Sequence, residues 1–364
     1  MGIIRLLLAL FVIVTHSESF FGFIFTGWQV AVELFFIISG FYMTMILNEK
    51  YVGDGSYALF IKNRFLKIYP TYWVVLFLTL FTATIFYIFL DNKAFAFNFY
   101  VDYFNLLEIE SFFLLVFSNL FIFGQDIIMF LGLDAEGGLF FTTNFWETNP
   151  PLWQGLFIQQ SWTLGIELTF YLLAPFIVRK STFFIFFLIT LSLLLRFFIY
   201  YDLELINDPW THRFFLSELA LFLFGTVSYR FYKRFHIENK YILWSLFLLI
   251  IAQLLFYEFF YANIDILNNW YLYIFFSLTL GYIFQLFKHS ELDSKIGEFS
   301  YPIYVSHLMI MAFVYFILSR IGLQEYLSEF TFIVSILFSY LIIKFIISPI
   351  EKLRVKNFKR SKNG

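Results

Sequence analysis

Residues 28–47 read WQVAVELFFIISGFYMTMIL, twenty residues among which Glu33 is the only one charged at neutral pH. In a helix, about twenty apolar residues cross the roughly 30 Å hydrocarbon core of a bilayer. The apolar residues are continuous and do not alternate with polar ones, which argues against a strand of a membrane barrel. This stretch therefore predicts a transmembrane helix.

Ten other stretches of the sequence are also long, continuous and apolar. The eleven runs lie at about 4–25, 28–47, 69–90, 111–131, 161–178, 182–200, 214–231, 241–260, 269–287, 300–319 and 329–348. Over all 364 residues, 61% are apolar and 14% are charged, whereas soluble domains carry roughly 25% charged residues. This composition excludes a soluble enzyme, a disordered chain and a nucleic-acid binder. The sequence predicts an all-α integral membrane protein.

The chain contains no Cys. This excludes a disulfide framework, a thiol nucleophile and a metal bound by thiolates. No group of His, Asp or Glu residues has the spacing of a metal site either, so we expect no metal.

The Lys and Arg residues predict how the chain crosses the membrane, because cytoplasmic joints are enriched in them. Besides Arg5 and a basic tail, most basic joint residues are Lys50, Lys62, Arg64, Lys67, Arg179, Lys180, Arg230, Lys233, Arg234, Lys240, Lys288 and Lys295, and the remaining joints contain only Lys93, Arg213 and Arg320. The joints rich in Lys and Arg all fall on one side only if run 111–131 does not cross. Gln125 and Asp126 favour a re-entrant or interfacial segment there. We therefore predict about ten transmembrane helices, with both termini cytoplasmic.

The domain organisation follows from the same pattern. Residues 1–350 are predicted to form a single membrane domain, and residues 351–364 a basic cytoplasmic tail. The joint at 49–68 is expected to be an interfacial helix.

Ionisable residues inside apolar runs are costly and are candidates for function. His16 follows Arg5 by eleven residues, which places both on one helix face roughly 16 Å apart. Glu33 is expected at a similar depth on the neighbouring helix, where a carboxylate beside His16 would orient a general base. The alternative is a hydrogen bond or ion pair that only locks two helices together.

Two further residues of this kind lie later in the chain. Glu167 enters its run from the outer side, and it either faces a polar cavity or pairs with Arg196 or Arg213. His307 lies about one third into its run from the cytoplasm. It either lines the entry of a cofactor or serves packing alone.

Five motifs in this order resemble the acyltransferase-3 family of integral membrane acyltransferases. They are Arg5 with His16, ELFFIISGF at 33–41, KNRFLKIYP at 62–70, Ser161-Trp162-Thr163-Leu164 with Glu167 and Tyr171, and Tyr301 and Tyr304 with His307. Many members have Asp where this chain has Glu33, and Arg where it has Lys67. The match extends over nearly the whole chain, which resembles a stand-alone polysaccharide or lipopolysaccharide O-acetyltransferase.

The resemblance implies transfer of an acyl group, usually acetyl, from cytoplasmic acyl-CoA to a hydroxyl of a cell-surface or lipid-linked glycan. The implied catalytic residues are His16, Glu33 and Glu167, with His16 as general base or transient acyl carrier. The implied donor-binding residues are Arg5, Arg64, Lys67, Tyr301 and His307. Partners would be the glycan and membrane lipid, without nucleic acid, for a multi-pass protein of the bacterial inner membrane.

Two other functions stay open from the sequence. A transporter or flippase of a lipid-linked glycan could use the same buried charges as a substrate path, although no pair of broken runs repeats in two halves. A non-enzymatic membrane partner in a polysaccharide assembly complex would keep its function after His16 and Glu33 were both neutralised.

Overall fold

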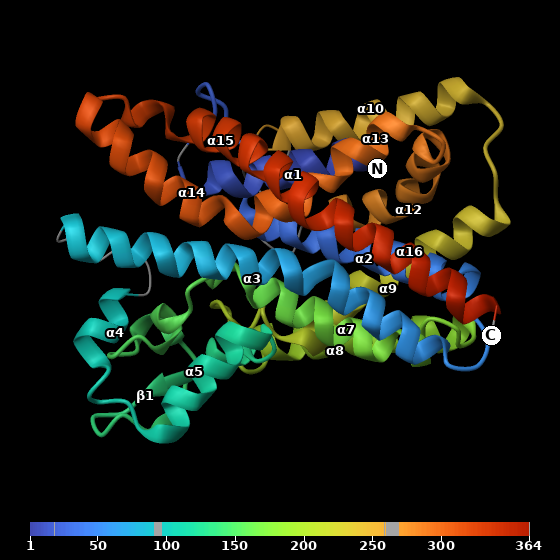
Figure 1. The fold of residues 1–364 in the computed structure, drawn as a ribbon. Helices are drawn as coiled ribbons and strands as arrows, with labels where there is room; N and C mark the ends of the chain where they lie inside the picture. Colours follow the sequence, from blue (N-terminus) through green and yellow to red (C-terminus); the bar gives the residue numbers. More distant parts are fainter. Residues whose placement is uncertain (18, 91–96, 258, 260–268, 364) are drawn as a thin grey trace. The chain divides into compact units, whose positions relative to one another are not determined.

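The computed structural model describes residues 1–17, 19–90, 97–257, 259 and 269–363, which are mostly helical (Figure 1). The helices are α1 (Gly2–Thr15), α2 (Trp28–Glu49), α3 (Ser56–Leu90), α4 (Phe97–Tyr103), α5 (Ile109–Phe121), α6 (Gln125–Ile128), α7 (Trp162–Ile177), α8 (Thr182–Tyr201), α9 (Phe215–Arg234), α10 (Lys240–Leu255), α12 (Trp270–Phe287), α13 (Glu291–Glu298), α14 (Ser300–Ile321), α15 (Leu327–Ile342) and α16 (Ser348–Asn363). A π-helical stretch, Ile343–Ile347, joins α15 to α16. The strands β1 (Leu131–Leu133) and β2 (Leu139–Phe141) form one antiparallel hairpin.

Six helical stretches in the described chain are long and apolar enough to cross a membrane. They are Trp28–Glu49, Ser56–Phe89, Thr182–Tyr201, Trp270–Phe287, Glu291–Ile321 and Gln324–Val355. The helical class of an integral membrane protein is thereby confirmed. The count of ten crossings and the cytoplasmic side of both termini stay predictions. Each of the ten predicted runs overlaps a helix, although run 241–260 includes residues 258 and 260, which lie outside the described residues.

The first helix is shorter than predicted. It ends at Thr15 rather than near residue 25, and His16 is its C-cap. Phe21 and Gly22 then both have positive φ, +48° and +79°, in a tight turn that the Phe20–Phe23 bridge closes. Two successive residues with positive φ cannot continue a right-handed helix. The helix itself ends before the polar residues 16–19 (HSES), which the hydropathy of the whole run averages out.

Two other segments clarify the predicted topology. The joint at 49–68 is not a separate interfacial helix, because its second half is the beginning of the 35-residue helix α3. Run 111–131 is broken: Ile122 and Gly124 have positive φ between α5 and α6. Neither of these two helices is long enough to cross a bilayer, in keeping with a segment that does not cross.

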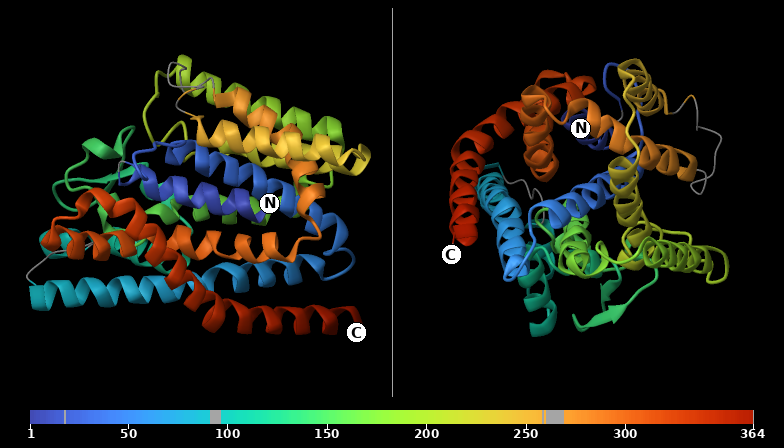
Figure 2. Two further views of the ribbon diagram at one scale, coloured as in Figure 1. Left: turned by 90° about the horizontal axis from the view of Figure 1, so that it is seen from above. Right: turned by 90° about the vertical axis from the view of Figure 1, so that its right-hand side faces the viewer.

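Contacts between Cα atoms divide the chain into two compact units. The first comprises Met1–Asn63, Leu173–Thr190 and Leu219–Gly364. In it, α1 packs against α2, α13, α14 and α15, and α12 packs against α2 and α10. Helices α14 and α15, orange to red in Figure 2, run side by side. Buried side chains of α1 and α14 form a shared core, so α14 holds the helix that ends in His16.

Close helix packing in this unit depends on glycine. Gly40 of α2 and Gly225 of α9 lie where these two helices meet. A Cβ atom on Gly40 would lie 1.8 Å from the carbonyl oxygen of Phe222, and one on Gly225 would lie 2.0 Å from that of Ile37. Small residues let membrane helices approach to backbone contact. No larger side chain fits at either position unless the helices separate.

The second unit comprises Arg64–Leu172 and Leu191–Glu218. Here three ring side chains of α3 donate hydrogen bonds to the last carbonyl groups of α5. They are Tyr69 to Phe121 (2.5 Å), Tyr72 to Asn119 (2.6 Å) and Trp73 to Leu120 (2.8 Å). The final carbonyls of a helix have no partner within the helix itself. These bonds allow α5 to end without leaving unpaired acceptors.

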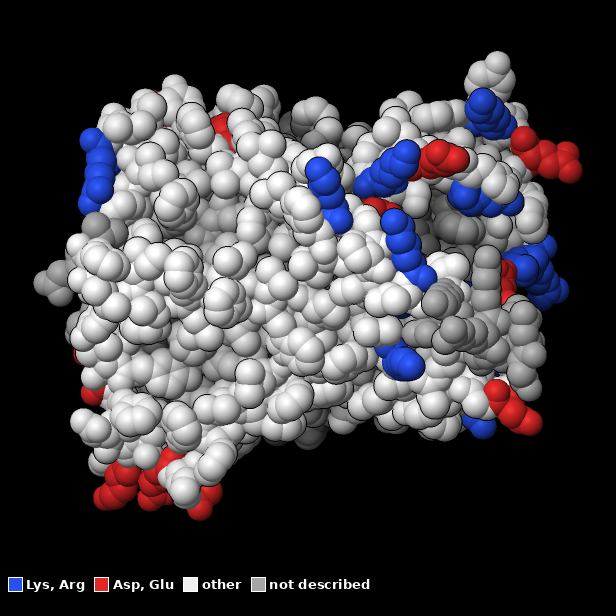
Figure 3. Space-filling model, in the orientation of Figure 1, with Lys and Arg blue, Asp and Glu red and all other residues white. Residues whose placement is uncertain are grey.

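The surface of the first unit shows few charged side chains where α14 and α15 lie, and Lys and Arg gather near α16 and α13 (Figure 3). Lys295 of α13 and Lys352 of α16 are both exposed. Large side chains such as Tyr315 and Leu337 are also more than half exposed, at 53% and 61%. Exposed apolar helix faces of this kind are expected of a surface that contacts lipid.

Candidate active site

The first polar cluster lies in the first unit, around His16. Its imidazole faces that of His307 from α14, with ring centroids 5.5 Å apart and planes inclined at 31°. Ala9 and Ile13 of α1 pack against Ile303 of α14, which fixes the two helices to each other just beside the imidazoles. Two predicted site residues from opposite ends of the sequence are therefore neighbours in space.

The two imidazoles differ in their surroundings. His16 is exposed, so a substrate can reach its ring. His307 is completely buried, and its Nδ1 lies 2.7 Å from the carbonyl oxygen of Tyr304. A carbonyl only accepts, so Nδ1 carries the proton and Nε2 has a free lone pair. No hydrogen-bond partner of Nε2 is found among the described residues.

The opposite end of α1 is held by a carboxylate. Asp293 of α13 accepts hydrogen bonds from the backbone N–H groups of Gly2 (2.8 Å) and Ile3 (3.1 Å). This satisfies two of the donors that a helix leaves unpaired at its first turn. Arg5 lies one turn further along, beside Gly297 of α13. Arg5 and His16 thus lie near the two ends of one anchored helix, whereas the predicted run 4–25 places His16 near its middle.

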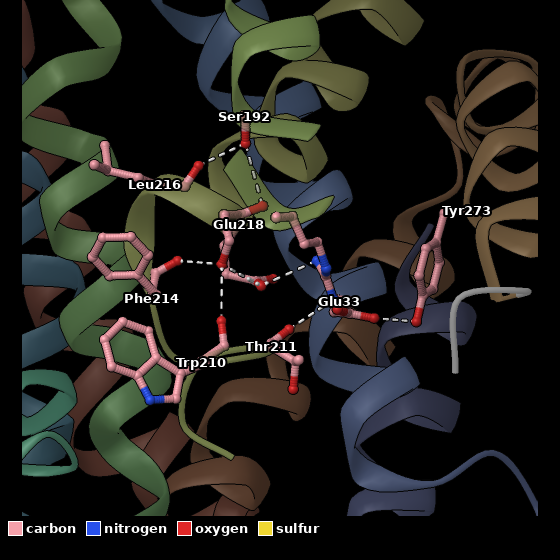
Figure 4. A network of polar contacts seen from close by, with 10 residues as sticks. Glu33, Ser192, Trp210, Thr211, Phe214, Leu216, Glu218 and Tyr273 are labelled. Carbon is pink, nitrogen blue, oxygen red and sulfur yellow. Dashed lines mark hydrogen bonds and ion pairs between the residues drawn. The ribbon is translucent and has the colours of Figure 1, made fainter. Parts of the chain in front are cut away.

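The structure gives Glu33 a partner in α12. Glu33 accepts a hydrogen bond from the hydroxyl of Tyr273 (Figure 4). Both groups are buried, at 3% and 1% exposed. The carboxylate–imidazole contact of Glu33 with His16 stays a prediction. The sequence gives no signal for Tyr273, which is one of 24 Tyr residues in the chain.

The second polar cluster lies in the second unit. The hydroxyl of Tyr171 donates to Glu167 Oε1 at 2.5 Å, one turn away on α7. The guanidinium of Arg64 lies 5.9 Å from the centre of the Tyr171 ring. Arg64 is buried, whereas Lys67, one turn further along α3, is exposed. The structure thus brings Arg64, Tyr171 and Glu167 together, all of them from the predicted motifs.

Two other arginines of this unit have acidic partners of their own. Arg196 pairs with Glu218 at 3.2 Å and donates to the carbonyl of Thr211, and Ser192 donates to nearby backbone carbonyls (Figure 4). Arg213 forms a two-pronged bond with Asp208, at 2.6 Å for each contact. A buried charge is costly unless it is paired and hydrogen-bonded. We therefore interpret these ion pairs as stabilising the fold of the second unit.

Asp126 lies against the motif helix of the same unit. A Cβ atom on Gly165 would come within 2.7 Å of the Asp126 carboxylate, so α7 can accept this side chain only at a glycine. Burial raises the pKa of Asp126 to about 6, although backbone N–H groups near the carboxylate oppose the shift. The segment that we predicted to be non-crossing therefore places a weakly acidic carboxyl beside the motif.

The remaining donor-binding candidates lie in α14. Tyr301, Tyr304 and His307 recur every third residue, and Tyr304 contacts the His307 ring at 5.9 Å. Tyr301 is partly exposed, whereas His307 offers no surface to a cofactor in this structure. Among the described residues, no group of three or more His, Asp or Glu side chains is arranged to hold a metal ion.

Comparisons with known proteins give one extended match. The sequence profile of a family described as acyltransferase domain matches residues 1–349, which include every candidate site residue. A stretch of 70 residues is 40% identical to part of "Protein 2 in picA locus" of Rhizobium radiobacter. That stretch covers 19% of this chain and 37% of the relative, little more than a third of its length. No solved structure matches the chain.

Proposed function

The chain belongs to the acyltransferase domain family, and on this premise we propose that it transfers an acetyl group from acetyl-CoA to a hydroxyl of a glycan. Family membership supports membrane acyltransferase activity. The acetyl donor, the cell-surface or lipid-linked glycan acceptor and the location in a bacterial inner membrane belong to the proposal.

The observation that carries the proposal is the exposed imidazole of His16 at the end of α1. Neutral imidazole is the common general base for deprotonating a hydroxyl near neutral pH. His16 takes the proton of the acceptor hydroxyl while that oxygen attacks the thioester carbonyl. A C–O ester bond forms, the C–S bond breaks, and the CoA thiolate leaves with the proton from His16.

A second route uses the same residue as a carrier. The imidazole nitrogen attacks the thioester and releases CoA, and the acceptor oxygen then attacks the acylimidazole. The two routes differ in one observable, since only the second labels the protein when the acceptor is absent.

Three cationic side chains are available to bind the phosphate groups of a CoA donor. Arg5 near the first turn of α1 supplies a cation about 16 Å from His16, and phosphate groups bind guanidinium strongly. Arg64 and Lys67 of the second unit supply two more cations, one buried and one exposed. We assign these three residues and Tyr301 to donor binding.

The carboxylates suit the acceptor. Glu167, whose orientation is fixed by Tyr171, is assigned to binding of the sugar hydroxyl. Glu33, which accepts a hydrogen bond from Tyr273, is assigned to the electrostatics of the site.

The proposal is tested with inverted membrane vesicles from the native host, with and without the protein. The vesicles receive CoA that carries a radiolabelled acetyl group, and label is followed in the glycan, lipid and protein fractions. Protein-dependent label in a glycan or lipid-linked glycan fraction is the expected result. Equal label in every fraction of both vesicle preparations would refute acyl transfer and favour a transporter.

A further inference from the structure

The imidazole of His307 is wholly buried, and one of its two nitrogen atoms, Nε2, makes no hydrogen bond to the described residues. Its Nδ1–H donates to the Tyr304 carbonyl, while Nε2 has no partner among the described residues. Buried polar atoms are nearly always hydrogen-bonded, and an exception of this kind asks for an explanation. The fixed Nδ1–H bond also fixes the tautomer, so Nε2 is available only as an acceptor.

A donor for this position lies directly beside it. The His16 ring centroid is 5.5 Å from that of His307, close enough for a nitrogen of one ring to approach a nitrogen of the other. His16 is exposed and lies just past the end of α1, so its ring has room to turn. Catalytic hydrogen bonds are often loose in the free enzyme and tighten when substrate binds.

We infer that His307 is the positioning residue of His16, accepting the N–H of one His16 nitrogen at Nε2 and thereby presenting the other nitrogen to substrate. This inference rests on the proposed function. His307 takes the orienting role that a carboxylate performs in other catalytic groups.

The proton transfers are consistent with this arrangement. When His16 accepts the proton of the acceptor hydroxyl, it becomes imidazolium and still donates its other N–H to His307. That bond is then charge-assisted and stronger. The proton returns to the departing CoA thiolate, and His307 remains neutral throughout. The stabilisation is thus greatest at the stage when positive charge is on His16.

The first test compares His307→Leu with His307→Gln. Gln has an acceptor oxygen that can reach the position of Nε2, whereas Leu has none. We expect His307→Leu to lower kcat on the order of 100-fold with little change in the KM for acetyl-CoA, and Gln to restore most of that loss. Met311→Leu, a nearly volume-conserving change in the same helix and core, is the matched control.

A second measurement separates this inference from the proposed function. Nitrogen-15 spectra of histidine-labelled protein report the tautomer of each ring, and His16→Ala and His307→Leu identify the signals. One tautomer of His16 in the native protein and a mixture in folded His307→Leu is the expected result. It supports the positioning role even if no acyl transfer is found. A mixture of tautomers in the native protein, or full kcat in His307→Leu, would overturn the inference.

Discussion

The buried imidazole of His307 lies 5.5 Å, centroid to centroid, from the exposed imidazole of His16. The spacing of ionisable residues in the sequence points instead to Glu33 as the partner of His16. In the structure, Tyr273 holds Glu33, and the second histidine stands beside the first. We propose His307 in place of Glu33 as the residue that orients this base.

Tyr273→Phe is expected to destabilise the protein by about 1–3 kcal/mol, because it removes a hydrogen bond to the buried carboxylate of Glu33. Chemical denaturation in detergent measures the change. Tyr271→Phe is the control, since that ring lies on the same helix and is 70% exposed. Equal stability of the two variants would show that the bond contributes nothing.

Asp293→Ala is expected to cost about 1 kcal/mol of stability, within the usual range for loss of a helix cap, because the N–H groups of Gly2 and Ile3 lose their acceptor. The comparison is with Glu291→Ala, an exposed position two residues earlier in α13. Hydrogen exchange at the start of α1 should rise only in the first variant. If both variants exchange alike, Asp293 does not anchor this helix.

Gly40→Ala is expected to destabilise the protein by about 1–3 kcal/mol or more, because the new methyl group would lie 1.8 Å from the Phe222 carbonyl oxygen. Thermal unfolding followed by fluorescence measures it. Gly27→Ala serves as the control, because a Cβ atom at Gly27 meets nothing within 4 Å. A Gly40→Ala protein as stable as the control would contradict the close approach of α2 and α9.

The pKa of Asp126, raised to about 6 by burial, predicts a pH dependence of stability. A carboxyl whose pKa is higher in the folded protein than in the unfolded chain favours folding while it is protonated. This contribution is present below about pH 4 and is lost as the pH rises through about 6. Between pH 4 and pH 7, native protein should therefore lose more stability than Asp126→Asn. Parallel curves for the two proteins would exclude a raised pKa.

The helices could be predicted from the sequence because lipid requires long continuous apolar runs. The end of α1 at Thr15 has a signal in the sequence, the polar residues 16–19 (HSES), whereas the turn at Phe21–Gly22 lies in apolar sequence and leaves hydropathy unchanged. The motif residues Glu167 and Tyr171 are one helical turn apart, so their contact follows from periodicity. The contacts of His16 with His307 and of Glu33 with Tyr273 join helices far apart in sequence, and they depend on packing that no local pattern encodes.

The most direct test of the account is acyl transfer by purified protein in nanodiscs, with radiolabelled acetyl-CoA and an extract of host glycans. Native protein is compared with His16→Ala and with His289→Ala, an exposed histidine of the joint between α12 and α13. Labelled glycan is expected with native protein and with His289→Ala, and a loss of at least about 100-fold with folded His16→Ala. Native rates of glycan labelling by His16→Ala would contradict it.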